Sequence, residues 1–305
     1  MLGFLLKRAA LALAVAVTVS IISFLLLRAS GDIAVAVAGE GATEADIEAI
    51  RIQFGFDRPL IVQYFEWAGN ALTGDLGQSV YFRVPVVELI GERMPVTMGL
   101  GALALVFAVA LSIPLGVAAA LRPNSIIDRL SLWIAVLGQA MPSFWFALLL
   151  MLVMGVWWRW LPISGAGGFD HYIMPAIALG YYATPAIMRL TRAGMIEVLE
   201  SDYIRTAHAK GLGTGKVLFK HALRNAVIPV VSLAAVQFGF MLSGSIVIES
   251  IFALPGVGHL AWISLQRSDF TVVQGIVLML SVIYILMALV ADLFNAWLDP
   301  RIRVA

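Results

Sequence analysis

The sequence predicts an all-α integral membrane protein that crosses the bilayer with six transmembrane helices. Hydrophobic residues make up 61% of the 305 positions and charged residues only 13%, and the mean hydropathy is +0.94. Soluble domains average about 45–50% apolar and about 25% charged residues, so a soluble core has no use for this excess. A formal net charge of +1 gives no global field for nucleic acid, and the absence of cysteine excludes disulfides and cysteine metal sites.

The apolar residues fall in six runs, each of 18 to 29 residues, that contain no Asp, Glu, Lys or Arg. A helix that rises about 1.5 Å per residue needs roughly 20 residues to cross a 30 Å hydrocarbon core. The fourth run is the shortest and contains Pro175 and Pro185, so we expect it to kink and to continue beyond Arg189. The runs cover residues 9–27, 94–121, 130–158, 171–188, 225–248 and 270–291.

Two further apolar features affect this count. Residues 250–266 are interrupted by prolines and glycines, which predicts a re-entrant or interfacial segment and not a seventh span. Lys7 and Arg8 precede the first run, as in a signal peptide. That run is longer than a usual signal sequence and no A-x-A site follows it, so a retained helix is favoured.

The basic residues lie mostly on one side of these six spans. With both termini on that side, two Lys/Arg precede the first run, two lie in residues 122–129, seven in residues 189–224 and two after residue 300, which is 13 of the 20. Because cytoplasmic loops carry an excess of Lys and Arg, the sequence predicts a multi-pass cell-membrane protein with cytoplasmic termini.

The chain then divides into three parts. Residues 1–30 hold the N-terminus and the first helix, residues 31–93 form an outer segment, and residues 94–305 form a five-helix core with a cytoplasmic loop at about 195–225. In the outer segment, Thr43 followed by Asp46 predicts a helix cap. We expect one or two short amphipathic helices there.

The cytoplasmic loop contains "RTAHAKGLGTGKVLFKHALRN", with five Lys/Arg, two His and no acid in residues 205–225. It lacks the G-x-x-x-x-G-K-[ST] order of a P-loop, which excludes nucleotide binding of that kind. A helix over residues 197–209 would place Ile196, Leu199, Tyr203 and Ala207 on one face, before three glycines and a second short helix. This pattern favours docking into a partner protein. A positive loop that rests on anionic lipid headgroups is the alternative.

Several segments resemble the peptide/nickel (dipeptide/oligopeptide permease) branch of ABC importer permeases. "YIRTAHAKGL" and "HALRNAVIPV" are similar to the cytoplasmic signature of that branch, although the acidic first residue and the proline of the general ABC signature are absent. The resemblance covers nearly the whole chain in the family's order. Its other segments are "FGFDRPLIVQYFEWAGNALTGDLGQS", "MPSFWFALLL", "FALPGVGHL", "RSDFTVVQGIV" and "LDPRIR".

The resemblance implies a type I ABC importer permease fold, a second permease subunit, two ATPase subunits and an extracytoplasmic solute-binding protein. The chain itself would be no enzyme and hold no cofactor, because ATP and Mg would sit on the ATPases. Peptides, nickel chelates, glutathione and some sugars all remain open as the solute. The positions that match the family's ATPase-coupling segment are Arg205, Thr206, Ala207, Lys210, Gly211, Leu212, Lys216, His221, Leu223 and Arg224.

Polar residues within or beside the apolar runs are candidates for the solute pathway, with helix–helix packing as the alternative for each. These candidates are Gln139, Tyr181, Tyr182, Thr184, Gln237, Ser243 and Glu249. We also expect Pro255, Gly256 and Gly258 to contact the binding protein at the mouth of the pathway, unless they only cap helix ends. The four His form no metal-ligand cluster. An ion-coupled carrier would need mid-span charges, which the runs lack, and a membrane scaffold that docks a cytoplasmic partner is the other alternative.

Overall fold

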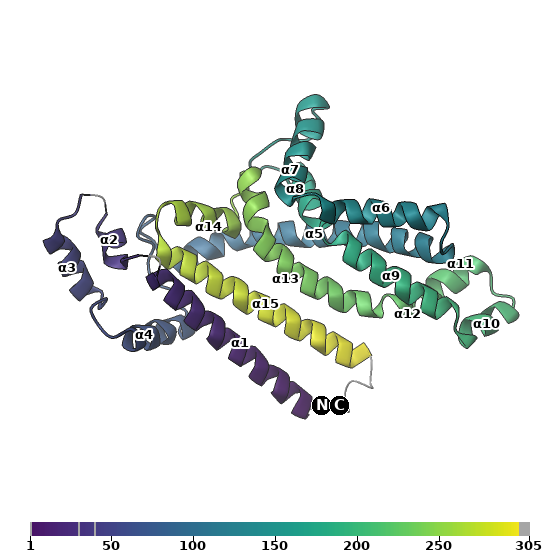
Figure 1. The fold of residues 1–305 in the computed structure, drawn as a ribbon, viewed down its shortest axis with the longest axis horizontal. Coiled ribbons are helices and arrows are strands. Elements are labelled where there is room, and N and C mark those ends of the chain that lie inside the picture. The colour runs from purple at the N-terminus through teal and green to yellow at the C-terminus, as the bar shows by residue number, and fades with distance from the viewer. Residues whose placement is uncertain (1, 30, 40, 299–305) are drawn as a thin grey trace.

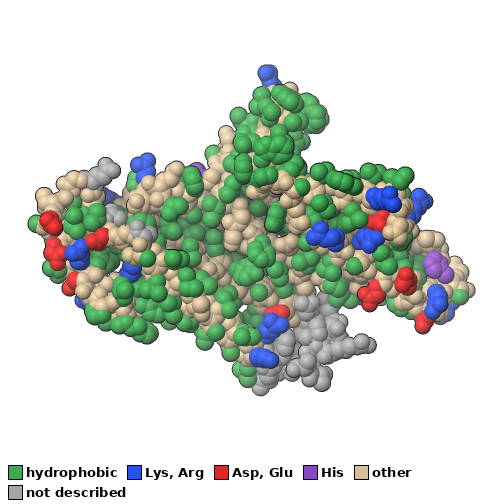
Figure 2. Space-filling view, viewed as in Figure 1, with side chains coloured by type: hydrophobic (Ala, Val, Ile, Leu, Met, Phe, Trp, Pro, Cys, Tyr) green, Lys and Arg blue, Asp and Glu red, His purple; other side chains and the backbone are tan. Residues whose placement is uncertain are grey.

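The computed structural model describes residues 2–29, 31–39 and 41–298, and every regular element within them is a helix. Figure 1 shows an elongated bundle in which the long helices run side by side. Figure 2 shows that hydrophobic side chains cover the middle of this face, whereas Lys, Arg, Asp and Glu gather toward its left and right ends, with a few more at the lower edge and at the top. A charge-free belt between charged ends is the pattern of a protein embedded in a bilayer.

Four helices are long and apolar enough to cross a membrane by themselves. The longest has 36 residues and contains Pro95 and Pro114 without being interrupted. The first and last of the four lie against each other, and Arg8 forms an ion pair with Asp292 at 2.8 Å near one end. These helices are α1 (Leu2–Ala29), α5 (Val86–Leu121), α13 (Ile228–Ile251) and α15 (Phe270–Leu298).

The third predicted span is broken. Its residues form α6 (Ile126–Ala140), α7 (Ser143–Leu150) and the π-helix η1 (Met151–Trp157), and the chain bends by 105° between α6 and the rest. Pro142 precedes α7, and a proline ring cannot continue the helix that ends at Ala140. If the bent pair counts as one span, the described residues provide five candidate spans, so the count of six remains a prediction.

The fourth predicted span is also interrupted, as its prolines suggested. It consists of α8 (Asp170–Tyr181) and α9 (Thr184–Leu199), with Pro185 in the first turn of α9. The helix therefore continues beyond Arg189, as predicted. Both helices pack against α5 and, with α13, form the main hydrophobic core around Leu100, Met174 and Ile248.

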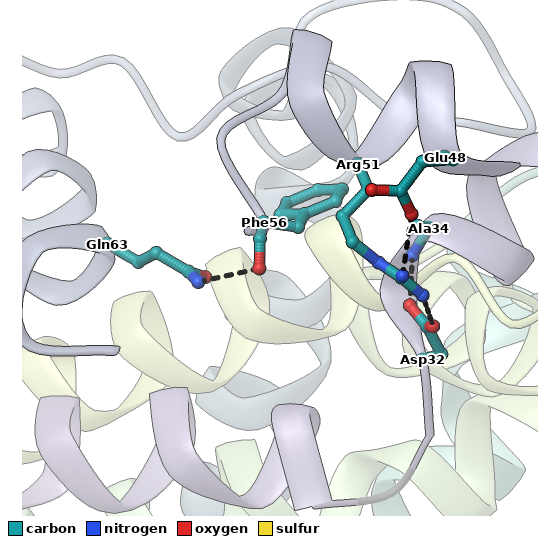
Figure 3. Close-up of polar contacts among 6 residues, drawn as sticks. All are labelled: Asp32, Ala34, Glu48, Arg51, Phe56 and Gln63. Carbon is teal, nitrogen blue, oxygen red and sulfur yellow. Dashed lines mark hydrogen bonds and ion pairs between the residues drawn. The ribbon is translucent and has the colours of Figure 1, made fainter. Parts of the chain in front are cut away.

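The segment between α1 and α5 contains three short helices, one more than predicted. They are α2 (Ile33–Ala38), α3 (Glu44–Gln53) and α4 (Leu60–Leu72). The predicted cap is confirmed, because Thr43 and Asp46 form a reciprocal capping box at α3. The Thr43 hydroxyl and amide hold the pKa of the Asp46 carboxyl below its usual range. In Figure 3, Arg51 of α3 reaches Asp32 and Glu48, which ties α3 to the residue that caps α2.

The basic loop (residues 195–225) folds into more pieces than its pattern suggests. After α9 it forms α10 (Asp202–Ala209), α11 (Thr214–Lys216), the π-helix η2 (Val217–Ala222) and α12 (Leu223–Ala226). The predicted helix over residues 197–209 is wrong in one respect, because Ser201 has an extended backbone and separates α9 from α10. At the other end of the core, residues 250–266 finish α13, turn, and form α14 (Val257–Gln266), which at about 15 Å is too short to cross a bilayer. The "LDPRIR" segment beyond Leu298 lies outside the described residues.

Candidate functional site

The basic loop is anchored by an apolar face that points into the bundle. Ile204 and Ala207 of α10 pack with Val217 and Leu218 of η2 against Met195 of α9. The break at Ser201 shifts the helical phase from the predicted one. Tyr203, which the uninterrupted helix would have placed on the buried face, is therefore 43% exposed.

The other face of the loop is open and basic. Of the ten coupling candidates, only Ala207 is buried, while Leu212, His221 and Leu223 are partly buried and the other six are exposed. Arg205 is the one cation among them that forms an ion pair within the described chain, with Asp202 one turn away. The loop therefore combines a fixed inner side with a free, positively charged outer side.

Three glycines shape the turn between α10 and α11. Gly211 has a φ of +77°, a left-handed conformation that favours glycine. A Cβ atom added at Gly211, Gly213 or Gly215 would meet nothing within 4 Å. The space around this turn is thus empty in the isolated chain.

An ion pair near the loop was not predicted from the sequence. Arg192 of α9 donates to both carboxylate oxygens of Asp128 on α6, at 2.8 and 2.7 Å. Asp128 is buried, and it also accepts from the Asn124 backbone N–H. This two-pronged contact holds residues 122–128 against the helix that leads into the loop. Both residues flank predicted runs, but nothing in the sequence pairs them.

Three of the pathway candidates line one pocket of about 640 Å³ where α6, α8 and α13 approach one another. Gln139 comes from the end of α6, Tyr182 from the break after α8, and Gln237 from the middle of α13. The rest of the lining is mostly apolar, with Met141, Pro142, Leu179, Phe240 and Met241 among it. A few amides in an apolar pocket can orient a polar solute without binding it tightly.

The remaining pathway candidates do not line this pocket. The Tyr181 hydroxyl donates to the Ile134 carbonyl. Thr184 is fully buried, and its carbonyl accepts from Ser112. Ser243 lines a different groove, between α13, α1 and α15.

Glu249 is fully buried at the far end of α13 from the basic loop. Its carboxylate accepts from the Thr97 hydroxyl at 2.8 Å and from the His259 backbone N–H at 3.0 Å. Thr97 in turn accepts from the Val257 N–H at 2.8 Å. Glu249 and Thr97 thus cap the first turn of α14, and we call this group the Glu249 clamp. The clamp joins α5, α13 and α14.

The two glycines at the start of α14 fit tightly against this clamp. A Cβ atom at Gly256 would lie 2.3 Å from a Glu249 carboxylate oxygen, and one at Gly258 would lie 2.6 Å from the Ile246 Cα. Pro255 is partly buried beside them. The three residues expected at the mouth of the pathway are therefore packed into the chain, which leaves α14 itself to present any surface there.

Comparison with known proteins agrees with this architecture. Residues 112–304 match the binding-protein-dependent transport system inner membrane component, and residues 1–101 match the N-terminal region of binding-protein-dependent transport system membrane proteins. The chain belongs to this family. As an ABC importer permease, it is a membrane transport subunit.

The similar proteins match this permease over its full length. It is 41% identical over 304 residues to the glutathione transport system permease protein GsiC of Escherichia coli O6:H1, and 40% identical to that of strain K12, with 99% of each chain covered. A crystal structure of an amino acid ABC transporter with histidines superimposes on 70% of this permease and 94% of its own chain, with a TM-score of 0.51 at 15% identity. That likeness extends to the fold alone.

Proposed function

We propose that this permease forms half of the membrane channel of an ATP-driven importer for peptides or a similar small solute, with glutathione as the first solute to test. The observation that carries the proposal is 40–41% identity over 99% of the chain to glutathione permeases. Two ATPase subunits supply ATP hydrolysis, a second permease completes the pathway, and a solute-binding protein delivers the solute from outside. Closure of the ATPases rocks the helices between inward- and outward-open states.

In this proposal the basic loop is the coupling segment, and it lies in the cytoplasm. Support comes from its two-sided construction, since α10 is held from within by Ile204 and Ala207 while its outer side is free. A rigid inner side allows the loop to transmit force to α9 and α13. The empty space around Gly213 and Gly215 would be filled by an ATPase groove.

A tryptophan placed at Gly213 tests this docking. Because its Cβ would touch nothing in the chain, Gly213→Trp should leave the fold intact and fail only where a partner approaches. We expect uptake of labelled glutathione into cells to fall at least tenfold, with unchanged amounts of protein in the membrane. Gly69→Trp on α4, which is also unobstructed, should retain uptake. Normal uptake by Gly213→Trp would contradict the coupling role.

The pocket lined by Gln139 and Gln237 is the proposed solute pathway. Replacing both with leucine would leave its size similar and remove its hydrogen-bonding amides. We expect Gln139→Leu/Gln237→Leu to lower uptake about tenfold, the effect of one or two lost hydrogen bonds, while ATP hydrolysis by the purified complex persists. Gln53→Leu, at the exposed end of α3, is the matched control. Unchanged uptake by the double variant would move the pathway elsewhere.

The proposed orientation can be tested with single cysteines, since the chain has none. A cysteine at Lys216 in the basic loop should react with a membrane-impermeant maleimide only after the cells are opened. A cysteine at Gln53, at the exposed end of α3, should react in intact cells once the outer membrane is permeabilised. The reverse pattern would place the loop outside.

A further inference from the structure

A second pocket lies where the end of α1, α4 and the start of α15 meet, far from the solute pathway. Its volume is about 230 Å³, several times the roughly 30 Å³ that one water occupies. Its lining combines a cation, two carboxylates, amides and aromatic rings. The residues that matter most are Arg28, Gln274, Asp75, Glu66 and Trp67.

The cation at this pocket is held in a fixed orientation. The Arg28 guanidinium lies 3.5 Å from the centre of the Phe24 ring, and its Nε donates to the Gln63 side chain at 2.9 Å. Gln63 in turn donates to the Phe56 carbonyl, as Figure 3 shows, and to the Arg58 carbonyl. Among the described residues, no carboxylate lies within 4 Å of Arg28, so its terminal nitrogens remain available for an anion.

Gln274 provides the second observation. Its side chain is 7% exposed, and its buried amide nitrogen has no hydrogen-bond partner. Buried donors in native proteins are nearly always satisfied, because an unpaired one costs about 1–3 kcal/mol. Arg28 and Gln274 both line the pocket, and a ligand oxygen would satisfy the Gln274 donor once that side chain turns toward the cavity. This pair suits a phosphate or carboxylate group.

The rest of the lining suits the opposite charge. Asp75 uses one carboxylate oxygen to accept from the Gly77 N–H at 2.8 Å, which leaves the other oxygen available. Glu66 is held by Arg58 at 2.5 Å, and Trp67 adds an aromatic ring. Carboxylates beside an indole ring attract an ammonium group. The whole lining therefore matches a zwitterion and not a simple anion.

The surroundings of the pocket have the side chains that are typical of a membrane interface. Tyr64 and Trp67 of α4 pack around Phe24 at the end of α1. The opposite side of α4 is apolar yet exposed, and Leu72 is 90% exposed. A short helix with aromatic residues and an unburied apolar side lies in the membrane interface. Leu25 and Leu26 of α1, next to Arg28 in the chain, are also exposed apolar side chains.

We propose that this pocket binds the headgroup of a phosphatidylethanolamine-type phospholipid, with its phosphate on Arg28 and Gln274 and its ammonium toward Asp75 and Trp67. The lipid's acyl chains lie along α1. The lipid would fasten residues 31–93 to the bundle, in the outer leaflet if the loop is cytoplasmic as proposed. The site does not depend on which solute is transported.

The test compares lipids on the purified complex of the permease with its partners. In native mass spectrometry, the wild-type complex should retain phosphatidylethanolamine about tenfold better than phosphatidylcholine, and this lipid should raise the unfolding temperature. Gln274→Met keeps the shape of the side chain and removes its donor, so it should lower retention about tenfold. Arg28→Gln should do the same, and Arg51→Gln, which removes a cation outside the pocket, should not.

Three results would overturn the proposal. One is equal retention of the two lipids by the wild-type complex. A second is retention by Gln274→Met and Arg28→Gln equal to that of the wild type. The third is equal protection by free O-phosphoethanolamine at matched concentration, which would make the pocket a site for a soluble zwitterion. Should Arg28→Gln fail to assemble, Gln274→Met alone decides, because removing an unpaired donor does not endanger the fold.

Discussion

Two glycine-rich turns of this permease look alike in sequence and differ completely in their surroundings. One is the "GLGTG" turn of the basic loop, and the other is the "PGVG" turn between α13 and α14. Around the first, a side chain would find empty space, whereas around the second it would strike Glu249 or the backbone of Ile246. Glycine in the first turn keeps a surface free for a partner. In the second it permits close packing within the chain.

The largest effect on stability should come from the packed turn. Gly258→Ala would bring a Cβ to 2.6 Å from the Ile246 Cα, and this backbone atom cannot move aside. We expect a loss of about 1–3 kcal/mol in unfolding free energy, as for overpacked cores. Thermal unfolding of the purified permease measures it. Gly215→Ala is the control, and equal melting temperatures for the two variants would remove the distinction between the turns.

An effect of similar size should come from breaking the Glu249 clamp. Thr97→Val and Glu249→Met each leave buried groups without partners, which costs about 1–3 kcal/mol apiece. Because both variants remove the same Thr97–Glu249 hydrogen bond, their effects should not add. A double-mutant cycle should show a coupling energy of about 0.5–3 kcal/mol. Strictly additive losses would mean that the two residues act separately.

A smaller effect is expected at Gly211, where conformation and not space is the constraint. With a φ of +77°, Gly211→Ala should cost about 1–2 kcal/mol at most. Gly211→Asn should cost less, because asparagine tolerates this region better. We therefore expect the unfolding temperature to be highest for the wild type, lower for Gly211→Asn and lowest for Gly211→Ala. Equal unfolding temperatures for Gly211→Ala and the wild type would mean that the turn does not require a residue that favours positive φ.

The smallest effect on stability belongs to Gly213→Ala, expected within about 0.5 kcal/mol of the wild type. Its added methyl group meets nothing in the chain. Measuring both the uptake activity and the melting temperature of Gly213→Ala would separate an effect on a partner from an effect on the fold. A clear loss of stability would show that the loop is more tightly packed than the open space around it indicates.

Local features of the fold could be predicted from the sequence, and long-range contacts could not. The Thr43–Asp46 cap needs residues only three apart, and the prolines of the fourth run predicted its interruption, with Pro185 in the first turn of α9. The 105° bend could not be predicted, because it depends on how α7 packs on α8. Tyr203 was assigned to the wrong face because one extended residue, Ser201, resets the helical phase.

In the candidate site, too, single residues could be predicted from the sequence, whereas their long-range contacts could not. Gln139, Tyr182 and Gln237 stood out as polar residues in apolar runs, and they do line one pocket, although their meeting was not visible in the sequence. Glu249 stood out for the same reason, yet its carboxylate is occupied by Thr97, 152 residues earlier. Asp128 and Arg192 are 64 residues apart. Pattern alone identifies which side chains are unusual but not which of them meet.

The separation of Thr97 and Glu249 also sets an order of events during synthesis. At about 5–20 residues per second, the ribosome needs roughly 8–30 s to add the 152 residues between them. During that time α5 has been synthesised, but its Thr97 hydroxyl lacks its hydrogen-bond acceptor, Glu249. The chain therefore completes this end of the bundle only after Glu249 of α13 has been synthesised, and a chain that ends before α13 cannot form the Glu249 clamp.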